Sequence, residues 1–348
     1  MFAVTIADLT YRYRQFLIAV LGAGLVMAMA ILLAGLAAGF GVEVIDTVGG
    51  VGASRWVLTS NSDGRITGAS VFPEAALTAI AHEPGVGQAA PLVILPGQVA
   101  RVNGRTETVV VIGVRRGALG DPVVNAGRAL GGPGQLVADT RAGAAVGSTV
   151  TVGAQRFRVA GEVGDRTLLG GVPIVYMTLK DAQDLTLGGR PLVSAIVTQG
   201  IPSTAPAGLT VFTAQRVEHQ TIQSLAAGAS SINNLKFLMW AVAAIIIAAL
   251  LYVSALQRTR DFSVLKALGS SSLLLLGSLV VQSVIVTFAA AAFAMIICNF
   301  MGGLFAQPVD IPASAFATLP LVAVIVGVLS SLVALRRATG ADPAAAFG

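Results

Sequence analysis

Four long stretches of the chain carry no charged side chain, and each is long enough to cross a lipid bilayer. Two of them run over Phe16–Phe40 and Phe237–Gln257. A third stretch of 43 uncharged residues separates Lys266 from Asp310, and a fourth covers Ile311–Leu335. A transmembrane helix needs about 20 apolar residues. The chain has 55% hydrophobic and 11% charged residues, against about 25% charged in a soluble domain, so its composition is that of an integral membrane protein.

We interpret the 43-residue stretch as one span followed by a surface loop, because charge favours an even number of spans. With four spans the basic residues that flank them lie in the cytoplasm, as the positive-inside rule requires, and Lys236 is the exception. The cytoplasmic set is Arg12, Arg14, Arg258, Arg260, Lys266, Arg336 and Arg337. The third span is placed near Leu273–Phe293. The loop after it is marked by the helix-interrupting residues Asn299, Gly302, Gly303, Gln307 and Pro308.

The region between the first two spans alternates short valine-rich runs with Gly, Pro, Asn and Asp, which is typical of strands joined by turns. Strands are predicted at residues 55–59, 98–102, 107–114, 135–138, 149–152, 156–163, 174–177 and 192–197. Helices are predicted over Pro73–His82, with the proline in the first turn, and over Leu179–Leu187. These elements predict an α+β domain with a mixed or antiparallel sheet. The stalk helix that follows is expected to break or kink near Gly228.

The predicted fold class is a membrane protein with four transmembrane α-helices and an α+β extracytoplasmic domain inserted between helices 1 and 2. Its parts are an N-terminal cytoplasmic segment with the first span (1–42), the α+β domain (43–212), the stalk helix (213–235), the second span (236–257), a cytoplasmic connecting helix (258–270), the third span with an outer loop (271–310), and the fourth span with a cytoplasmic tail (311–348). The preference for arginine over lysine, with abundant Ala, Gly and Val, is typical of a bacterial genome of high GC content. We therefore expect a multi-pass protein of the bacterial plasma (inner) membrane, with both termini in the cytoplasm.

Several kinds of chemistry are missing from the sequence. No glycine precedes any of the three lysines, so the phosphate-binding loop of ATP-using chains is missing, and neither a G-x-S-x-G nor an H-E-x-x-H motif occurs. Two histidines and one cysteine, Cys298, exclude a disulfide within the chain and a multi-histidine metal centre. The charge-free spans argue against an ion-coupled carrier. We expect no enzyme activity, no cofactor and no nucleic-acid partner for this chain.

The segment that joins the second and third spans is short and amphipathic. Its apolar side chains recur at three-residue steps, and its charged side chains lie off that face. The apolar set is Phe262, Leu265 and Leu268, the charged set off that face is Arg260, Asp261 and Lys266, and Arg258 lies at the start of the segment. Gly269 is suited to end a helix here. A helix this short is marginal alone in water, so either the membrane surface or a groove of a partner protein is expected to hold it.

Four motifs point to a known family. The connecting segment reads R-T-R-D-F-S-V-L-K-A-L-G from Arg258 to Gly269, residues 12–17 read R-Y-R-Q-F-L, residues 146–163 read V-G-S-T-V-T-V-G-A-Q-R-F-R-V-A-G-E-V, and residues 335–347 read L-R-R-A-T-G-A-D-P-A-A-A-F. With these motifs and the order of one span, a large domain and three spans, the chain resembles the permeases of the MacB and FtsX type, which are related to the LolC and LolE subunits, within the ATP-binding-cassette transporters. Asp261 departs from the family, whose members commonly carry glutamate there; it keeps the charge.

The resemblance implies a permease subunit whose segment 258–269 docks on a separate ATPase chain as a coupling helix. Two copies of that ATPase would bind ATP and Mg, while Phe262, Leu265 and Leu268 fill its groove and the basic residues contact its rim. Such permeases act in pairs, as homodimers or paralogous heterodimers, in contact with membrane lipids. The pair Gly35 and Gly39, at the outer end of the first span, is a possible dimer contact.

The resemblance also implies mechanotransmission, in which ATP hydrolysis inside moves the extracytoplasmic domain to export, extract or transport a substrate. An alternative is a membrane-anchored signalling or scaffold subunit that regulates an envelope enzyme, such as a cell-wall hydrolase, without transport. An ATPase chain that copurifies through the inside segment fits both hypotheses and excludes an ion-coupled carrier.

Overall fold

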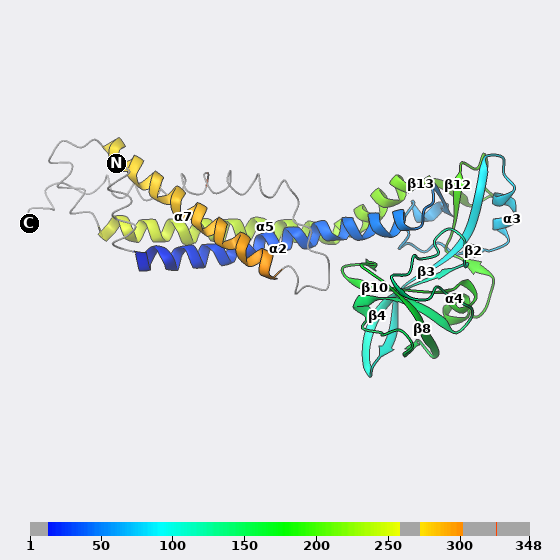
Figure 1. The fold of residues 1–348 in the computed structure, drawn as a ribbon. Helices are drawn as coiled ribbons and strands as arrows, with labels where there is room; N and C mark the ends of the chain where they lie inside the picture. The colour runs from blue at the N-terminus through cyan, green and yellow to red at the C-terminus, as the bar shows by residue number, and fades with distance from the viewer. Residues whose placement is uncertain (1–12, 258–271, 302–324, 326–348) are drawn as a thin grey trace, which may run out of the picture. The chain divides into compact units, whose positions relative to one another are not determined.

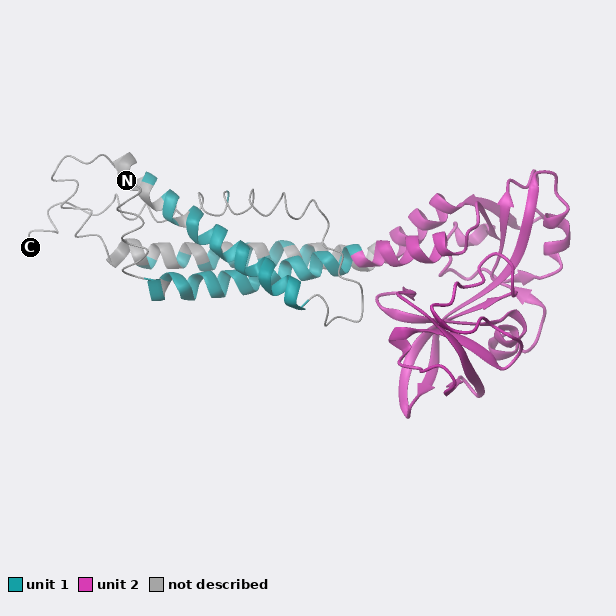
Figure 2. Ribbon diagram, in the orientation of Figure 1, with its two compact units in different colours: residues 1–38, 230–305, 309–348 teal, residues 39–229, 306–308 magenta. Residues whose placement is uncertain are grey.

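The computed structural model describes residues 13–257, 272–301 and 325. These residues fall into two compact units, which are described separately (Figure 2). The first holds described residues 13–38, 230–257, 272–301 and 325, and the second holds residues 39–229. Two helices, α2 (Tyr13–Gly50) and α5 (Ala214–Gln257), have residues in both units and are continuous along their length.

The first unit is helical, with the N-terminal part of α2, the C-terminal part of α5, and α7 (Ser272–Met301) (Figure 1). Among the described residues, two helices are long and apolar enough to cross a membrane: Phe16–Gly50 in α2, with mean hydropathy 2.7, and Val280–Met301 in α7, with 2.3. The second predicted span lies in α5. The fourth predicted span lies outside the described residues apart from Ile325, so a total of four spans stays a prediction.

Helices α2 and α7 approach each other closely in the first unit. A β-carbon built on Gly24 of α2 would lie 2.9 Å from the backbone oxygen of Ala290 and 2.7 Å from the Phe293 ring. One turn further along α2, the Cys298 thiol donates a hydrogen bond to the Ala28 carbonyl at 3.4 Å. Because a β-carbon does not fit at this crossing, glycine is required at position 24.

The second unit is built on an 11-stranded sheet in the order β13-β1-β12-β3-β4-β10-β6-β8-β5; β7 pairs with β3 and β8, and β9 pairs with β10. Its strands are β1 (Arg55–Thr59), β3 (Val86–Val102), β4 (Arg105–Val114), β5 (Ala126–Gly127), β6 (Gln135–Asp139), β7 (Thr149–Val152), β8 (Gln155–Val163), β9 (Thr167–Leu168), β10 (Val172–Thr178), β12 (Ala195–Gly200) and β13 (Leu209–Thr213). The pairs β4–β10 and β6–β8 are parallel and the other strand pairs of this sheet are antiparallel, so the predicted mixed sheet is confirmed.

Shorter elements complete the second unit. They are a two-stranded sheet of β2 (Phe72–Pro73) and β11 (Leu192–Val193), the helices α3 (Ala76–Ala81) and α4 (Leu179–Thr186), and the 3-10 helices η1 (Ser60–Ser62) and η2 (Thr140–Ala142). Helix α4 is capped by Thr178, whose hydroxyl accepts a hydrogen bond from the Asp181 N–H. A side chain that caps the first turn satisfies a backbone N–H that has no partner within the helix.

The main sheet has a hydrophobic core on each face, because side chains alternate along a strand. On β4, Val110 and Ile112 join the core that also holds Val44 of α2 and Val217 of α5. Val111, on the opposite face of β4, joins the core that holds residues of α3 and α4. The ends of the two long helices therefore pack on one face of the sheet, and the two short helices pack on the other.

Most predicted strands of this domain are confirmed. The predicted strand at residues 192–197 is instead divided at Ser194 into β11 and β12, which belong to different sheets. The sequence analysis missed the two-residue strands β5 and β9, strand β13, and residues 86–97 of β3, which contain Pro91 and Pro96 and lead into a register shift between Leu95 and Gln98. Proline removes a backbone donor and so masks a strand in the sequence pattern. The predicted helix over Leu179–Leu187 is confirmed as α4.

Three expectations are wrong. Pro73 lies in strand β2, opposite Leu192, and not in a first helical turn, since α3 begins only at Ala76. Proline lacks a backbone N–H, and it is tolerated in such a short edge pair because no hydrogen bond from that position is required. The predicted break at Gly228 is absent, since α5 continues as one helix through this residue; a glycine inside a helix costs only about 1 kcal/mol, which a long helix tolerates. A kink without a break stays a prediction. Asn299 lies within α7 and not in a loop. The apolar residues that precede it sustain the helix through this position.

Candidate functional site: the anchored helix ends and a cavity of the α+β unit

A buried carboxylate anchors the end of α2 in the second unit. Glu43 is 2% exposed. Its Oε1 accepts hydrogen bonds from the Thr167 hydroxyl at 2.8 Å and from the Gly171 N–H at 2.6 Å, and its Oε2 accepts one from the Gly170 N–H at 2.8 Å. A buried carboxylate is costly unless donors surround it. These donors come from β9 and the turn to β10, so Glu43 ties α2 to that hairpin.

Arg166 makes a second tie between the same segment and α2. Its guanidinium donates to the carbonyl oxygen of Asp46 at 2.7 Å, and a β-carbon on Gly50 would lie 2.7 Å from its Nη1 atom. Its backbone N–H donates to Oδ2 of the fully buried Asp139 at 2.6 Å. Burial raises the pKa of Asp139, while the backbone N–H groups of Arg166 and Arg141 act in the opposite direction. The last turns of α2 are thus held through both a side chain and a main-chain carbonyl.

The start of α5 is fixed in the same unit. Val217 is fully buried in the core, and the buried Thr221 hydroxyl accepts a hydrogen bond from the Ile66 N–H at 3.2 Å. A β-carbon on Gly41 of α2 would lie 3.9 Å from Ile222 of α5, which is ordinary van der Waals contact. The two helix ends therefore pack on each other as well as on the sheet.

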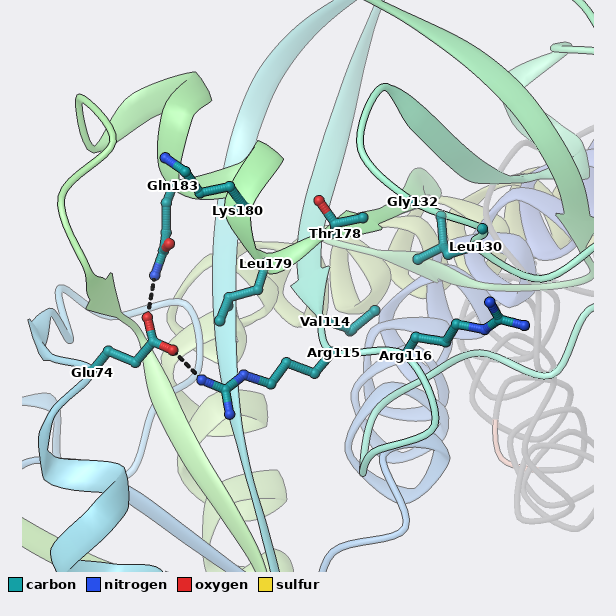
Figure 3. Close-up of a pocket in the computed structure, with 11 residues that line it drawn as sticks. Glu74, Val114, Arg115, Arg116, Leu130, Gly132, Thr178, Leu179, Lys180 and Gln183 are labelled. Carbon is teal, nitrogen blue, oxygen red and sulfur yellow. Dashed lines mark hydrogen bonds and ion pairs between the residues drawn. The ribbon is translucent and has the colours of Figure 1, made fainter.

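An open cavity of about 450 Å³ lies where the parallel strands β4 and β10 end (Figure 3). Arg115 and Glu74 form an ion pair there, and Gln183 Nε2 donates to the other Glu74 oxygen at 2.8 Å. The Arg116 side chain points away from this pair (Figure 3). Val114, Leu130 and Leu179 add apolar surface. The cavity combines charged and apolar walls, which suits binding of a partly polar ligand.

No metal site emerges in the part of the chain that the structure describes. No group of three or more His, Cys, Asp or Glu side chains in it could hold a metal ion. His82 is exposed at the end of α3 and its Nδ1 lies 2.6 Å from the Thr78 carbonyl, and His219 lies 3.4 Å from Gln223 on α5. Both histidines are accounted for by local helix contacts.

The residues proposed from the sequence are placed unevenly. All eight of the connecting segment lie outside the described residues: Arg258, Arg260, Asp261, Phe262, Leu265, Lys266, Leu268 and Gly269. Gly35 and Gly39 lie on α2, and both are buried within the single chain; their part in a dimer stays a prediction. The sequence analysis missed Glu43, although its signal was present as the first acidic residue after a long uncharged run.

Comparisons with known proteins agree on one family. The model of the FtsX-like permease C-terminal region matches residues 235–343. An uncharacterized ABC transporter permease of Mycobacterium tuberculosis is 33% identical over 348 residues, which cover 100% of this chain and 99% of the relative. Another, from Mycobacterium bovis, is 34% identical with the same coverage.

Two solved structures are similar at 15% identity. The periplasmic region of MacB from Actinobacillus actinomycetemcomitans aligns with a TM-score of 0.37, over 52% of this chain and 98% of that one. The extracellular domain of the noncanonic ABC-type transporter YknZ from Gram-positive bacteria aligns with a TM-score of 0.36, over 46% of this chain and 100% of that one.

Proposed function

Because this chain belongs to the ABC transporter permeases of the FtsX-like family, we propose that it couples ATP hydrolysis by a separate ATPase subunit to movement of its α+β unit. In this proposal the α+β unit is extracytoplasmic, both termini are cytoplasmic, and four spans cross the plasma membrane. The permease works as a pair, with two ATPase copies that bind ATP and Mg. The chain itself carries out no catalysis.

The observation that carries the proposal is the anchoring of two continuous helices. Helix α2 runs through an apolar stretch and is anchored near its end by Glu43, whose carboxylate has three donors. Helix α5 begins at Ala214, is held in its first turns by the buried Val217 and Thr221, and continues to Gln257, the residue before the connecting segment. A helix without a break transmits a shift or a rotation of one end to the other. To move the α+β unit in this way, the helix has to be firmly attached to it.

The proposed contact with the ATPase is the segment 258–269. Phe262, Leu265 and Leu268 would enter a groove of the ATPase, and Arg258, Arg260, Asp261 and Lys266 would contact its polar rim. Gly269 would end the helix. The missing phosphate-binding loop is consistent with ATP bound by another chain.

The test is copurification of the ATPase with the full-length permease carrying Leu265→Asp. A charge in an apolar groove is costly, so we expect the ATPase to be lost while the permease still elutes as a folded species. The matched control is Ser263→Asp, which adds the same charge off the apolar face. An ATPase that stays bound to Leu265→Asp at the wild-type ratio contradicts the coupling assignment.

A further inference from the structure

The α+β unit carries a row of arginine and threonine side chains across four strands. In the pairing register, Arg156 of β8 lies opposite Thr151 of β7, Thr151 lies opposite Arg101 of β3, and Arg101 lies opposite Thr106 of β4. Arg158 follows on β8 opposite Thr149. Paired residues and residues two apart on a strand share a face of the sheet. All three arginines therefore project from the same face.

This face is exposed and has no acidic neighbour in the rows just described. The three arginines are exposed, while the residues that alternate with them, such as Phe157, are buried. Within the described residues none of the three forms an ion pair. Glu107 of β4 pairs with the buried Ala100 and so belongs to the opposite face. Glu162, four residues beyond Arg158 on β8, accepts a hydrogen bond from the Val146 N–H at 3.1 Å.

A groove continues from this face along β8. It has a volume of about 540 Å³ and is lined by Arg158 and Arg128, by Gln135, and by the backbone of Gly127 and Gly147. No carboxylate lines it. Arg128 reaches its place because its backbone N–H donates to the Ala160 carbonyl at 2.9 Å. The basic face and the groove thus share Arg158 and form one path from Arg101 to Arg128.

We infer that this path is a binding site for a phosphate-rich linear polymer. Guanidinium groups bind phosphate oxygens through two parallel hydrogen bonds, and threonine hydroxyls are further donors. Arg156 and Arg158 are spaced by about 6.7 Å along the strand, and Arg101 lies about 9.6 Å across from Arg156, two strands away. Such spacing along an open path suits successive phosphates of a chain better than one small anion. The inference does not depend on the proposed coupling to an ATPase.

The experiment measures binding of short-chain inorganic polyphosphate to the full-length protein in nanodiscs of zwitterionic lipid. The test variant is Arg101→Ser/Arg156→Ser/Arg158→Ser. The matched control, Arg55→Ser/Arg190→Ser/Arg216→Ser, removes the same charge from other parts of the unit. We expect the test variant to bind about tenfold more weakly, since each exposed charge pair contributes a factor of roughly two to five. The negative slope of log affinity against log salt concentration should become shallower by about 2, since each lost phosphate contact removes roughly 0.7.

A third variant, with all three arginines replaced by lysine, keeps the charge and loses the paired hydrogen bonds, so its affinity should be intermediate. Equal weakening in the test and control variants overturns the site, because net charge alone would then explain binding. Polyglutamate that binds as tightly as polyphosphate overturns the assignment to phosphate. If the protein binds vesicles of anionic lipid but not polyphosphate in solution, the ligand is a lipid surface and the assignment to a polymer is overturned.

Discussion

The anchoring of α2 by Glu43 can be tested through Glu43→Ala. The substitution removes the carboxylate that accepts hydrogen bonds from the Gly170 and Gly171 N–H groups and from the Thr167 hydroxyl. Each buried donor left without a partner costs about 1–3 kcal/mol. The hydroxyl can rotate toward another acceptor, so the two N–H groups dominate. The α+β unit should therefore lose roughly 2–6 kcal/mol of unfolding free energy.

Two measurements on the full-length protein report this loss. For a domain of this size, 1 kcal/mol shifts the thermal midpoint by about 2–4 °C, so we expect a fall of about 10 °C. Amide hydrogen exchange should rise by roughly 100-fold or more at residues 167–171, where the anchor opens. Glu43→Gln should lie between, because its amide oxygen can keep two donors while its NH₂ group faces the third.

The matched control for these substitutions is Asp46→Asn. Asp46 is an exposed acid less than one helical turn further along α2, and it contributes its main-chain oxygen to the contact with Arg166. The control should leave the thermal midpoint and the exchange of residues 167–171 unchanged. If Glu43→Ala behaves like Asp46→Asn in both measurements, the anchor does not stabilise this junction and our reasoning is refuted.

Two further predictions concern close packing and alkaline pH. Gly24→Ala should destabilise the full-length protein by about 1–3 kcal/mol, because its β-carbon meets the Ala290 oxygen at 2.9 Å. Gly22→Ala, with only Ile246 at 3.9 Å, should be neutral or stabilising by up to about 1 kcal/mol, and thermal unfolding in detergent separates the two. Burial raises the pKa of Tyr176 to about 12 from 10.0, so the folded state keeps a proton that the unfolded state loses, and stability falls as the pH rises through that range. Tyr176→Phe should remove this loss of stability, which reaches roughly 2–3 kcal/mol at the upper end of the range. If alkaline pH unfolds Tyr176→Phe and the wild-type protein at the same midpoint pH, the prediction is contradicted.

The sequence predicts the parts of this fold that depend on local pattern. The run Arg55–Thr59 is β1 to the residue, and Thr149–Val152 is β7. What it does not predict depends on distant partners. Pro73 is in a strand because Leu192 lies opposite, and β3 contains Pro91 because β12 pairs with it there. Neither partner is visible in a short window of sequence.

The candidate site shows the same division. The charge-free run that ends at Phe40 suggests a helix that stops at the membrane edge, yet α2 continues to Gly50. Its last turns are polar enough to lie outside a membrane, and their helical state is sustained by contacts with residues 166–171. Those donors lie more than 120 residues away from Glu43 in the chain. A single carboxylate after an uncharged run is recognisable in sequence, but its three donors are not.

The balance of charge in the α+β unit links the anchor to the proposed polymer site. The unit holds nearly equal numbers of acidic and basic residues, which by itself predicts no charged face. Four of its acids are engaged within the fold: Glu43 with the β9–β10 turn, Asp139 with the backbone of Arg141 and Arg166, Glu74 with Arg115, and Asp181 with Thr178 and Gly134. Arg101, Arg156 and Arg158 have no such partners among the described residues. Because these acids are paired within the fold while the three arginines are exposed on one face of the sheet, a unit with almost no net charge presents a basic face.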